Sequence, residues 1–374
     1  MYRASRSRLQ HSVTTAHGVT TASGLQELSA RLQQQTRVGL DTEFLRERTY
    51  RAQLCLVQLS SPTEAAWIDP LALHDLSALV AVLTATSVVK VMHASRQDLE
   101  VLFPVAGLSA PVFDTQIAAA LAGFPAQVGY AELVRRLLGH ELAKSHTRTD
   151  WSRRPLSPEQ LEYALDDVRY LLPLAEQLQA RLGQLGRLEW LREELAALGD
   201  PGAFIVDPEQ AWRRLKGLRG LDPGRERLAR ELAAWRERRA VEHDRPRGWI
   251  LDDAGLREVV MRVPRSAQAL AQIRELPAGL VQRRGAELLA CVTAAAVPDP
   301  APAVPDRPPS DPTRAALLRK LAAIVQNVAA ELAIAPEVLA TRRDLEQLAA
   351  GLEDAAVLRG WRRAAVGERL LAAL

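Results

Sequence analysis

A change in hydrophobic pattern along the chain constrains the fold more than any other feature. Up to about residue 120, short apolar runs typical of β-strands alternate with patterns that repeat every three to four residues, as in helices. From about residue 157 onward, nearly every segment has the helical pattern. The first part therefore predicts an α/β domain with a mixed sheet covered by helices, and the second part predicts small all-α units.

The expected elements follow from these patterns. The helix that begins after Ser157 has a strong start signal, with Ser157 as N-cap, Pro158 at the first helical position and Gln160 at the third. Pro173 should kink or interrupt this helix, because proline lacks the backbone N–H that the helix needs. Strands are expected at residues 37–44, 50–60, 65–70 and 88–94, and helices at residues 73–83, 95–105, 113–123, 157–182 and 186–198.

Domain boundaries are expected on two grounds. A chain of 374 residues is too long for one ordinary core. Residues 297–312 hold seven prolines and almost no large apolar side chains, which predicts an extended, solvated linker. The expected division is an α/β domain at residues 1–205, a helical domain at 207–296, the proline-rich linker at 297–312 and a second helical domain at 313–374.

Composition and charge narrow the class of protein. Four of the 48 basic residues are lysines, and the arginine excess fits either phosphate contacts or a GC-rich genome. Residues 207–296 carry 18 Lys plus Arg against 13 Asp plus Glu, an excess of five that is compatible with nucleic-acid binding. The sequence shows neither a signal peptide nor an apolar run of 18 residues, so we expect no membrane association. The two cysteines, Cys55 and Cys291, lie in apolar stretches and are expected to be buried free thiols in a reducing cytoplasm.

Two carboxylates on one apolar strand raise the first question of function. Asp41 and Glu43 are two residues apart, so they point to the same face of a strand, while Val38 and Leu40 point to the other. Like charges this close destabilise a fold unless a cation lies between them, and carboxylate oxygens suit Mg²⁺ or Mn²⁺. The alternative is that the strand lies at a sheet edge and water solvates both carboxylates.

Two further acidic positions each have a plain structural interpretation. Asp98 lies three residues after Ser95 at a strand-to-helix turn, which is the spacing of a capping box. Tyr163 and Asp167 are four apart and share one face of a helix, where Tyr163 could simply pack and the Asp166–Asp167 pair could be solvated. A carboxylate at a strand-to-helix turn also faces the crevice where α/β sheets bind ligands.

Taken together, these motifs form an ordered set. A D-x-E on a strand, an Asp about 55 residues later and Y-x-x-x-D on a helix resemble the DEDD exonuclease superfamily in its tyrosine-bearing branch, since Glu162 stands where the other branch has histidine. The chain is similar to the ribonuclease D family, and the two helical units after residue 207 resemble HRDC domains. The stretches that carry this resemblance are residues 40–59, 91–102, 113–123 and 144–174 and the helical C-terminal units.

The resemblance implies a ribonuclease H-like mixed sheet and a set of site residues. Asp41, Glu43, Asp98 and Asp167 match the family's metal-binding carboxylates, and Tyr163 matches the residue that orients the attacking water. The implied cofactors are two divalent metal ions, Mg²⁺ or Mn²⁺, which can activate water and stabilise the leaving 3′ oxygen. If the tyrosine spacing were misread, Asp166 would replace Asp167 as the last ligand. The basic loop 144–154 offers further candidates for binding a single-stranded 3′ end, with a packed tryptophan and solvated arginines as the alternative: Lys144, Arg148, Trp151 and Arg153.

The resemblance implies a cytoplasmic 3′→5′ exoribonuclease that releases nucleoside 5′-monophosphates from RNA with a single-stranded 3′ end, including tRNA precursors. We expect no obligate protein partner. Two alternatives are a DNA exonuclease with the same chemistry and a catalytically silent nucleic-acid-binding protein. Loss of a carboxylate would mark the silent protein, and none is missing here.

Overall fold

The computed structural model describes residues 15–107, 110–143, 149–218, 220–296, 312–352 and 354–374. By their internal contacts, these residues form two compact units. Unit 1 takes its residues from 1–45, 54–204 and 310–374, and unit 2 takes its residues from Arg46–Gln53 and Ile205–Pro309. Each unit is therefore built from chain segments that are far apart in the sequence.

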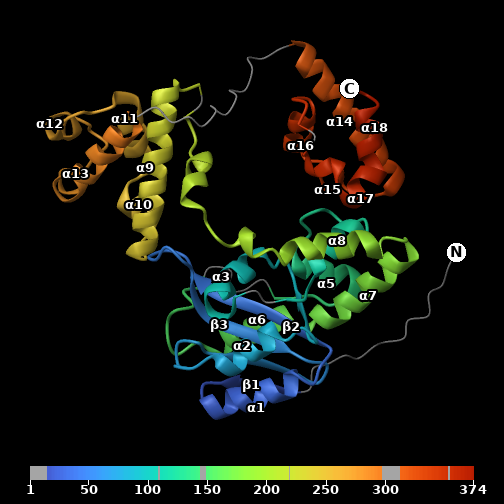
Figure 1. Cartoon of the computed structure of the whole chain (residues 1–374). Helices are drawn as coiled ribbons and strands as arrows, with labels where there is room; N and C mark the ends of the chain where they lie inside the picture. The colour runs from blue at the N-terminus through green and yellow to red at the C-terminus, as the bar shows by residue number, and fades with distance from the viewer. Residues whose placement is uncertain (1–14, 108–109, 144–148, 219, 297–311, 353) are drawn as a thin grey trace. The chain divides into compact units, whose positions relative to one another are not determined.

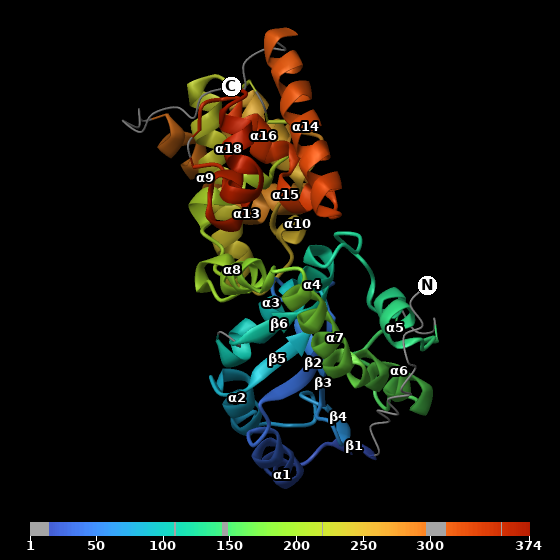
Figure 2. The same ribbon diagram turned by 90° about the vertical axis from the view of Figure 1, so that its right-hand side faces the viewer.

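Unit 1 is organised around one mixed sheet whose six described strands run in the order β1-β4-β3-β2-β5-β6, as Figure 2 shows. Parallel pairs join β1 to β4, β2 to β5 and β5 to β6, whereas β3 and β4 are antiparallel. The predicted mixed sheet is thus confirmed. The strands are β1 (Thr15–Val19), β2 (Arg37–Leu45), β3 (Gln53–Ser60), β4 (Glu64–Ile68), β5 (Val89–Met92) and β6 (Val112–Asp114).

Helices cover both faces of this sheet (Figures 1 and 2). On one side, α1, α2 and α3 pack together, with α3 against β2. On the other side, α6 and α7 lie against β2, and α4, α5 and α8 pack on α7. The helices are α1 (Ala22–Leu32), α2 (Ser77–Thr84), α3 (Arg96–Ala106), α4 (Thr115–Leu121), α5 (Tyr130–Leu138), α6 (Pro158–Arg169), α7 (Leu171–Gln184) and α8 (Leu188–Leu198).

The long helix predicted from residue 157 begins and breaks as its sequence indicates. The Ser157 side chain accepts the backbone N–H of Gln160, whose side chain accepts the N–H of Ser157 in return, so the capping box is present. The helix is interrupted at Tyr170, which separates α6 from α7 and places Pro173 in the first turn of α7. The interruption predicted from Pro173 is confirmed.

The C-terminal helices belong to unit 1 and share a hydrophobic core with it. The indole of Trp361 is 4% exposed and stacks on that of Trp190 from α8, with ring centroids 4.4 Å apart. Glu194 of α8 accepts the Trp361 indole N–H at 2.7 Å and pairs with Arg362. These elements are α14 (Pro312–Leu332), α15 (Pro336–Leu339), α16 (Arg342–Leu348), the 3₁₀ turn η3 (Ala356–Leu358), α17 (Gly360–Arg362), the π-helical turn η4 (Arg363–Gly367) and α18 (Glu368–Leu371).

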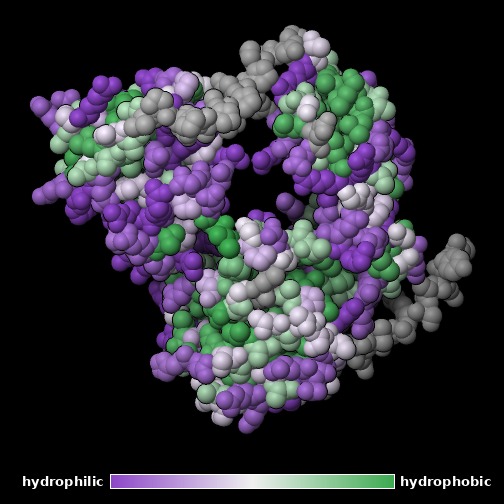
Figure 3. Space-filling view, viewed as in Figure 1, coloured by the Kyte–Doolittle hydropathy of each residue, from purple (hydrophilic) through white to green (hydrophobic). Residues whose placement is uncertain are grey.

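Unit 2 is helical and is built around α9, against which η2, α10, α11 and α13 pack. Its core is apolar, and over α9 and α10 the face seen in Figure 3 is mostly hydrophilic. Cys291 is a buried free thiol here, as Cys55 is in unit 1, so the prediction that both cysteines are buried and free is confirmed. The elements are the 3₁₀ turn η2 (Pro208–Arg214), α9 (Pro223–Glu242), α10 (Arg247–Ile250), α11 (Asp253–Arg262), α12 (Ala267–Ala271) and α13 (Ala278–Ala295), and the short turn η1 (Pro201–Ala203) lies before them in unit 1.

The segment between β2 and β3 also belongs to unit 2, and we call residues 46–53 the arm. Its Tyr50 packs against the unit 2 core, and the Tyr50 hydroxyl donates to Glu237, a carboxylate that is 1% exposed. Arg247 binds both oxygens of Glu237 and lies 4.7 Å over the Tyr50 ring. Asp244 accepts the backbone N–H of Tyr50 at 3.1 Å. The arm is thus fixed by specific bonds as well as by packing.

Candidate active site

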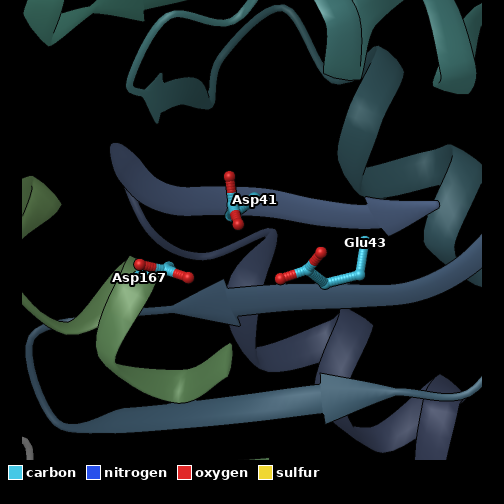
Figure 4. A group of neighbouring side chains, drawn as sticks. All are labelled: Asp41, Glu43 and Asp167. Carbon is cyan, nitrogen blue, oxygen red and sulfur yellow. The ribbon is translucent and has the colours of Figure 1, made fainter. Parts of the chain in front are cut away.

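Three carboxylates meet between strand β2 and helix α6. One oxygen from each of Asp41, Glu43 and Asp167 lies within 4.8 Å of the others, and Figure 4 shows the three side chains gathered in one place. Asp41 and Glu43 come from β2, and Asp167 comes from the second half of α6. The structure therefore brings together three of the four carboxylates that the resemblance singles out.

The close approach of α6 to β2 depends on a missing side chain. A Cβ on Gly39 would lie 2.3 Å from the Ser60 Oγ and 3.0 Å from the backbone oxygen of Val168. The Ser60 hydroxyl donates to that same Val168 oxygen at 2.8 Å, which ties the end of α6 to β3. Since β2 lies between β3 and β5, the alternative of a solvated edge strand is wrong.

The fourth acidic residue, Asp98, approaches from the start of α3 and is 8% exposed. Its carboxylate accepts the Thr42 hydroxyl at 2.5 Å, so it is held by the residue between Asp41 and Glu43. The capping-box interpretation of Asp98 is wrong, because the backbone N–H and the hydroxyl of Ser95 both donate to Asp114 instead. Asp98 is not in the 4.8 Å group, but its charge still acts on that group.

Burial and mutual repulsion disfavour the ionised forms of these acids. Burial, followed by the charges of Asp98 and Asp167, raises the pKa of Asp41 well above its ordinary value. Burial and the same two neighbours raise the pKa of Glu43 to about 8. Burial, with the charges of Asp166 and Asp98, raises the pKa of Asp167 to about 7. A cation held between these oxygens would relieve the repulsion, so the cluster is suited to a positively charged ligand.

The donor set indicates which cation fits. All of the clustered ligand atoms are carboxylate oxygens, which hard divalent ions such as Mg²⁺ prefer. Neither sulfur nor imidazole takes part in this group of described residues. The site therefore has the chemistry of a divalent-metal centre.

Tyr163 lies one helical turn before Asp167 on α6. Burial, together with the charges of Asp167 and Glu43, raises the pKa of Tyr163 to about 12, so its phenol stays protonated at neutral pH. Asp166, which was the alternative to Asp167, pairs with Arg169 at 2.7 Å and lies outside the carboxylate group. The geometry of α6 therefore favours Asp167 over Asp166.

The basic loop is described only in part, because Lys144 and Arg148 lie outside the described residues. Trp151 is 5% exposed and stacks on the ring of Tyr163, with centroids 6.3 Å apart. This burial fits the packed alternative, because a nucleobase could not reach the ring. The Arg153 side chain is 84% exposed and pairs with Asp150.

Arg154, the other arginine of this loop, is taken up by contacts within the protein. Its guanidinium binds both oxygens of Asp69, at 2.6 and 2.7 Å, and donates to the backbone oxygens of Cys55 and Trp151. For Arg154, the alternative of a solvated arginine is therefore wrong. Through its bond to Cys55, Arg154 fastens the loop to β3. The loop carries Trp151, whose ring stacks on that of Tyr163.

Sequence reasoning missed the residues that support the site. Thr42, Gly39 and Ser60 hold Asp98 and the end of α6, but a small or hydroxyl side chain on a strand gives no local signal of such a contact. His93, directly after β5, hydrogen-bonds with the Thr115 hydroxyl and the Val128 carbonyl.

Comparison with known proteins places this geometry in a family. Residues 16–183 match the model of a 3′-5′ exonuclease domain, and residues 225–292 match the HRDC domain. Ribonuclease D of Nitrobacter hamburgensis is 39% identical over 93% of this chain and 92% of its own length. Ribonuclease D of a Jannaschia species is 42% identical over 96% and 94%.

The solved structures agree with the sequence relatives. Escherichia coli RNase D, described as an exoribonuclease involved in structured RNA processing, matches with a TM-score of 0.86 and 33% identity over 96% of this chain and 98% of that one. No described helix is both long and apolar enough to cross a membrane. The fold, the carboxylate site and the relatives that match most of the chain all lead to the same conclusion. The chain belongs to the ribonuclease D family of 3′→5′ exoribonucleases.

Proposed function

We propose that this exoribonuclease trims short single-stranded 3′ tails from structured RNAs, including tRNA precursors, one nucleotide at a time. The observation that carries the proposal is the group of Asp41, Glu43 and Asp167 beside Asp98. The similar E. coli protein, described as acting in structured RNA processing, supports the class of substrate. Two buried free cysteines suit a reducing compartment, and we place the activity in the cytoplasm.

In this proposal, the four carboxylates hold two divalent cations, Mg²⁺ or Mn²⁺. When bound, such cations supply a nucleophilic hydroxide and stabilise charge on the leaving 3′ oxygen. Asp41, Glu43 and Asp167 contribute oxygens from two elements, while Thr42 orients Asp98. Tyr163 keeps its proton at neutral pH, so its hydroxyl can hydrogen-bond to the attacking water and orient it without adding a further negative charge.

The first test pairs the wild type with Asp41→Asn, which removes a charge and keeps the shape of the side chain. Both proteins receive a 3′-extended tRNA and a single-stranded DNA of equal length, in Mg²⁺ and then in EDTA. We expect stepwise shortening of the RNA by the wild type in Mg²⁺ only, and a loss of at least about a hundredfold in the variant, because an essential ligand charge is gone. Preference for DNA would move the protein to a repair role, and no metal-dependent trimming of either substrate would overturn the proposal.

We also propose that residues 1–205 are the exonuclease domain and that 207–296 and 313–374 are HRDC-like domains joined by the linker 297–312. In this proposal, the HRDC-like domains hold the body of the RNA while its 3′ end enters the carboxylate site. Trp249 on α10 supports the RNA-holding role, because this large aromatic side chain is 60% exposed. The Arg245 guanidinium lies 5.7 Å from its ring centroid, so stacking surface and positive charge adjoin.

Trp249→Ala tests this role without deleting a domain. Loss of one stacking contact should weaken binding of a structured RNA about tenfold, while turnover of a short oligonucleotide stays at the wild-type rate. Filter binding and single-turnover trimming measure the two quantities. Equal affinity of variant and wild type for the structured RNA would count against Trp249 as a contact.

A further inference from the structure

A tyrosine hydroxyl lies inside the break between α6 and α7. The Tyr130 hydroxyl donates to the backbone oxygen of Asp166 at 3.0 Å, and the backbone N–H of Tyr170 donates to the Tyr130 oxygen at 3.3 Å. In an uninterrupted α-helix, the Tyr170 N–H would bind the Asp166 oxygen directly, since these groups are four residues apart. The phenol thus bridges the two groups that the break separates, and a side chain inserted into the ladder is a recognised cause of a kink.

Pro173 interrupts the same ladder three positions further on. In a regular helix the carbonyl of Arg169 would accept the N–H of residue 173, but that residue is proline and has none. Helical bonding resumes at Leu174, whose N–H donates to the Tyr170 oxygen at 3.1 Å. Pro173 therefore removes the helical donor to the Arg169 carbonyl, and the Tyr130 hydroxyl supplies a donor to the Asp166 carbonyl.

The carbonyl that Tyr130 holds is directly connected to the site. The oxygen of Asp166 lies in the planar peptide unit that ends at the Cα of Asp167. Fixing the direction of this C=O therefore fixes the plane from which the Asp167 side chain begins. The second fixed point is the Ser60 bond to the Val168 oxygen, on the other side of Asp167.

Tyr130 is itself held in place. It is the first residue of α5, and its ring lies 5.6 Å from that of His93. One ring nitrogen of His93 lies 2.9 Å from the Thr115 hydroxyl, and the other lies 3.1 Å from the Val128 carbonyl. His93 thus supports the ring whose hydroxyl reaches into the helix break.

We propose that Tyr130 is a positioning residue, which acts through the backbone of Asp166 to set the carboxylate of Asp167 against Asp41 and Glu43. This inference rests on the proposed role of Asp167 as a metal ligand. In this role Tyr130 acts through the helix backbone and needs no contact with the substrate. Its contribution is to the affinity of the carboxylate site for its divalent cation.

The test replaces only the hydroxyl, as Tyr130→Phe. Tyr170→Phe is the matched control, because it removes a hydroxyl at the same helix break while leaving its backbone N–H in place. Full-length proteins are titrated with Mg²⁺, and two quantities are followed: trimming of a 3′-extended RNA, and the rise in melting temperature that Mg²⁺ produces without RNA. Wild-type trimming that EDTA abolishes is established first.

We expect the Mg²⁺ concentration for half-maximal trimming to rise about tenfold in Tyr130→Phe, as is typical for loss of a group that orients a metal ligand, and to stay unchanged in Tyr170→Phe. The Mg²⁺-induced rise in melting temperature should shrink in the same variant, and saturating Mg²⁺ should restore most of kcat. A lower melting temperature with an unchanged Mg²⁺ requirement would overturn the inference, because it would show a purely structural bond. A wild type that trims RNA equally well in EDTA would instead overturn the proposed function.

Discussion

The fold holds the acidic residues of the site in positions that disfavour their ionised forms. The folded chain keeps Asp41, Glu43 and Asp167 close together, although burial and repulsion favour their protonated forms. Gly39 lets α6 approach β2 closely, because it has no side chain, and the Thr42 hydroxyl binds Asp98. The metal-free site therefore costs stability, as expected of a preorganised site.

The raised pKa values predict how metal-free stability varies with pH. Between about pH 4 and pH 8, the folded state binds more protons than the unfolded state, because the pKa values of Glu43 and Asp167 rise to about 8 and about 7 on folding. This stabilising contribution is fully present below the ordinary carboxyl pKa and is lost as pH rises through 7 and 8. In EDTA, the melting temperature should therefore fall between pH 6 and pH 8.5 more than it does in Mg²⁺.

The variant Asp41→Asn sharpens this prediction. It removes a carboxyl group whose ionised form is disfavoured by burial and by the charges of its neighbours, so in EDTA at pH 8.5 it should melt about 2 to 4 °C above the wild type, a shift that corresponds to about 1 kcal/mol. In saturating Mg²⁺ the order should reverse. Differential scanning fluorimetry measures both cases, and a variant that melts below the wild type in EDTA at pH 8.5 would contradict the repulsion argument.

Among the elements, the arm lies between β2, which carries Asp41 and Glu43, and β3, and it belongs to unit 2. Its Tyr50 shares a network with Glu237 and Arg247, and Glu237 is almost fully buried. A carboxylate buried to this degree needs all of its partners, because an unpaired buried charge is costly. The arm is therefore a structural part of unit 2 and not a surface loop.

Removing the Tyr50 hydroxyl should loosen the arm. Tyr50→Phe should lower the free energy of unfolding by about 1 to 2 kcal/mol, since the hydroxyl bonds to a charged partner. A double-mutant cycle with Glu237→Gln, measured by urea unfolding, isolates the Tyr50–Glu237 interaction from other effects. A coupling energy near zero would mean that packing alone holds the arm.

Local patterns predicted those elements whose signal lies in their own residues. The strand expected at residues 37–44 is β2, and the capping signal at Ser157 gives the start of α6. The edge strand β1 was not predicted, because its five residues are mostly exposed and carry no apolar alternation. The spacing of Ser95 and Asp98 misled because Asp114, which is distant in sequence, takes the donors of Ser95.

The candidate site, too, could be predicted only where the signal lies in neighbouring residues. The D-x-E and Y-x-x-x-D motifs could be read along the chain, because strand and helix periodicities place each pair on one face. The support given by Thr42, Ser60 and Tyr130 joins residues 56, 108 and 36 positions apart, and these contacts exist only after folding. Their residue types are common on any strand or helix.

At the scale of the whole molecule, the C-terminal helices are part of the core of unit 1. Trp361 stacks on Trp190 and bonds to two glutamates of α8. Deleting residues 297–374 would therefore uncover apolar surface on the exonuclease domain. Such a deletion would confuse a loss of RNA binding with a loss of stability.

A point substitution measures this interface directly. Trp361→Ala should lower the free energy of unfolding by about 3 to 5 kcal/mol, the range for loss of a large buried aromatic side chain. Trp249→Ala is the matched control at a 60% exposed tryptophan, and it should change stability by less than about 0.5 kcal/mol. Chemical unfolding of both proteins makes the comparison, and equal losses would contradict the assignment of Trp361 to the core.

The way the two units share the chain has a consequence for its synthesis on the ribosome. The arm emerges early, but its partners at residues 237–247 emerge almost two hundred residues later. The core of unit 1 likewise includes Trp361, which emerges long after the strands of the sheet. A nascent chain therefore cannot complete the core of unit 1 until Trp361 has been synthesised, so chains that stop before this residue would lack part of that core.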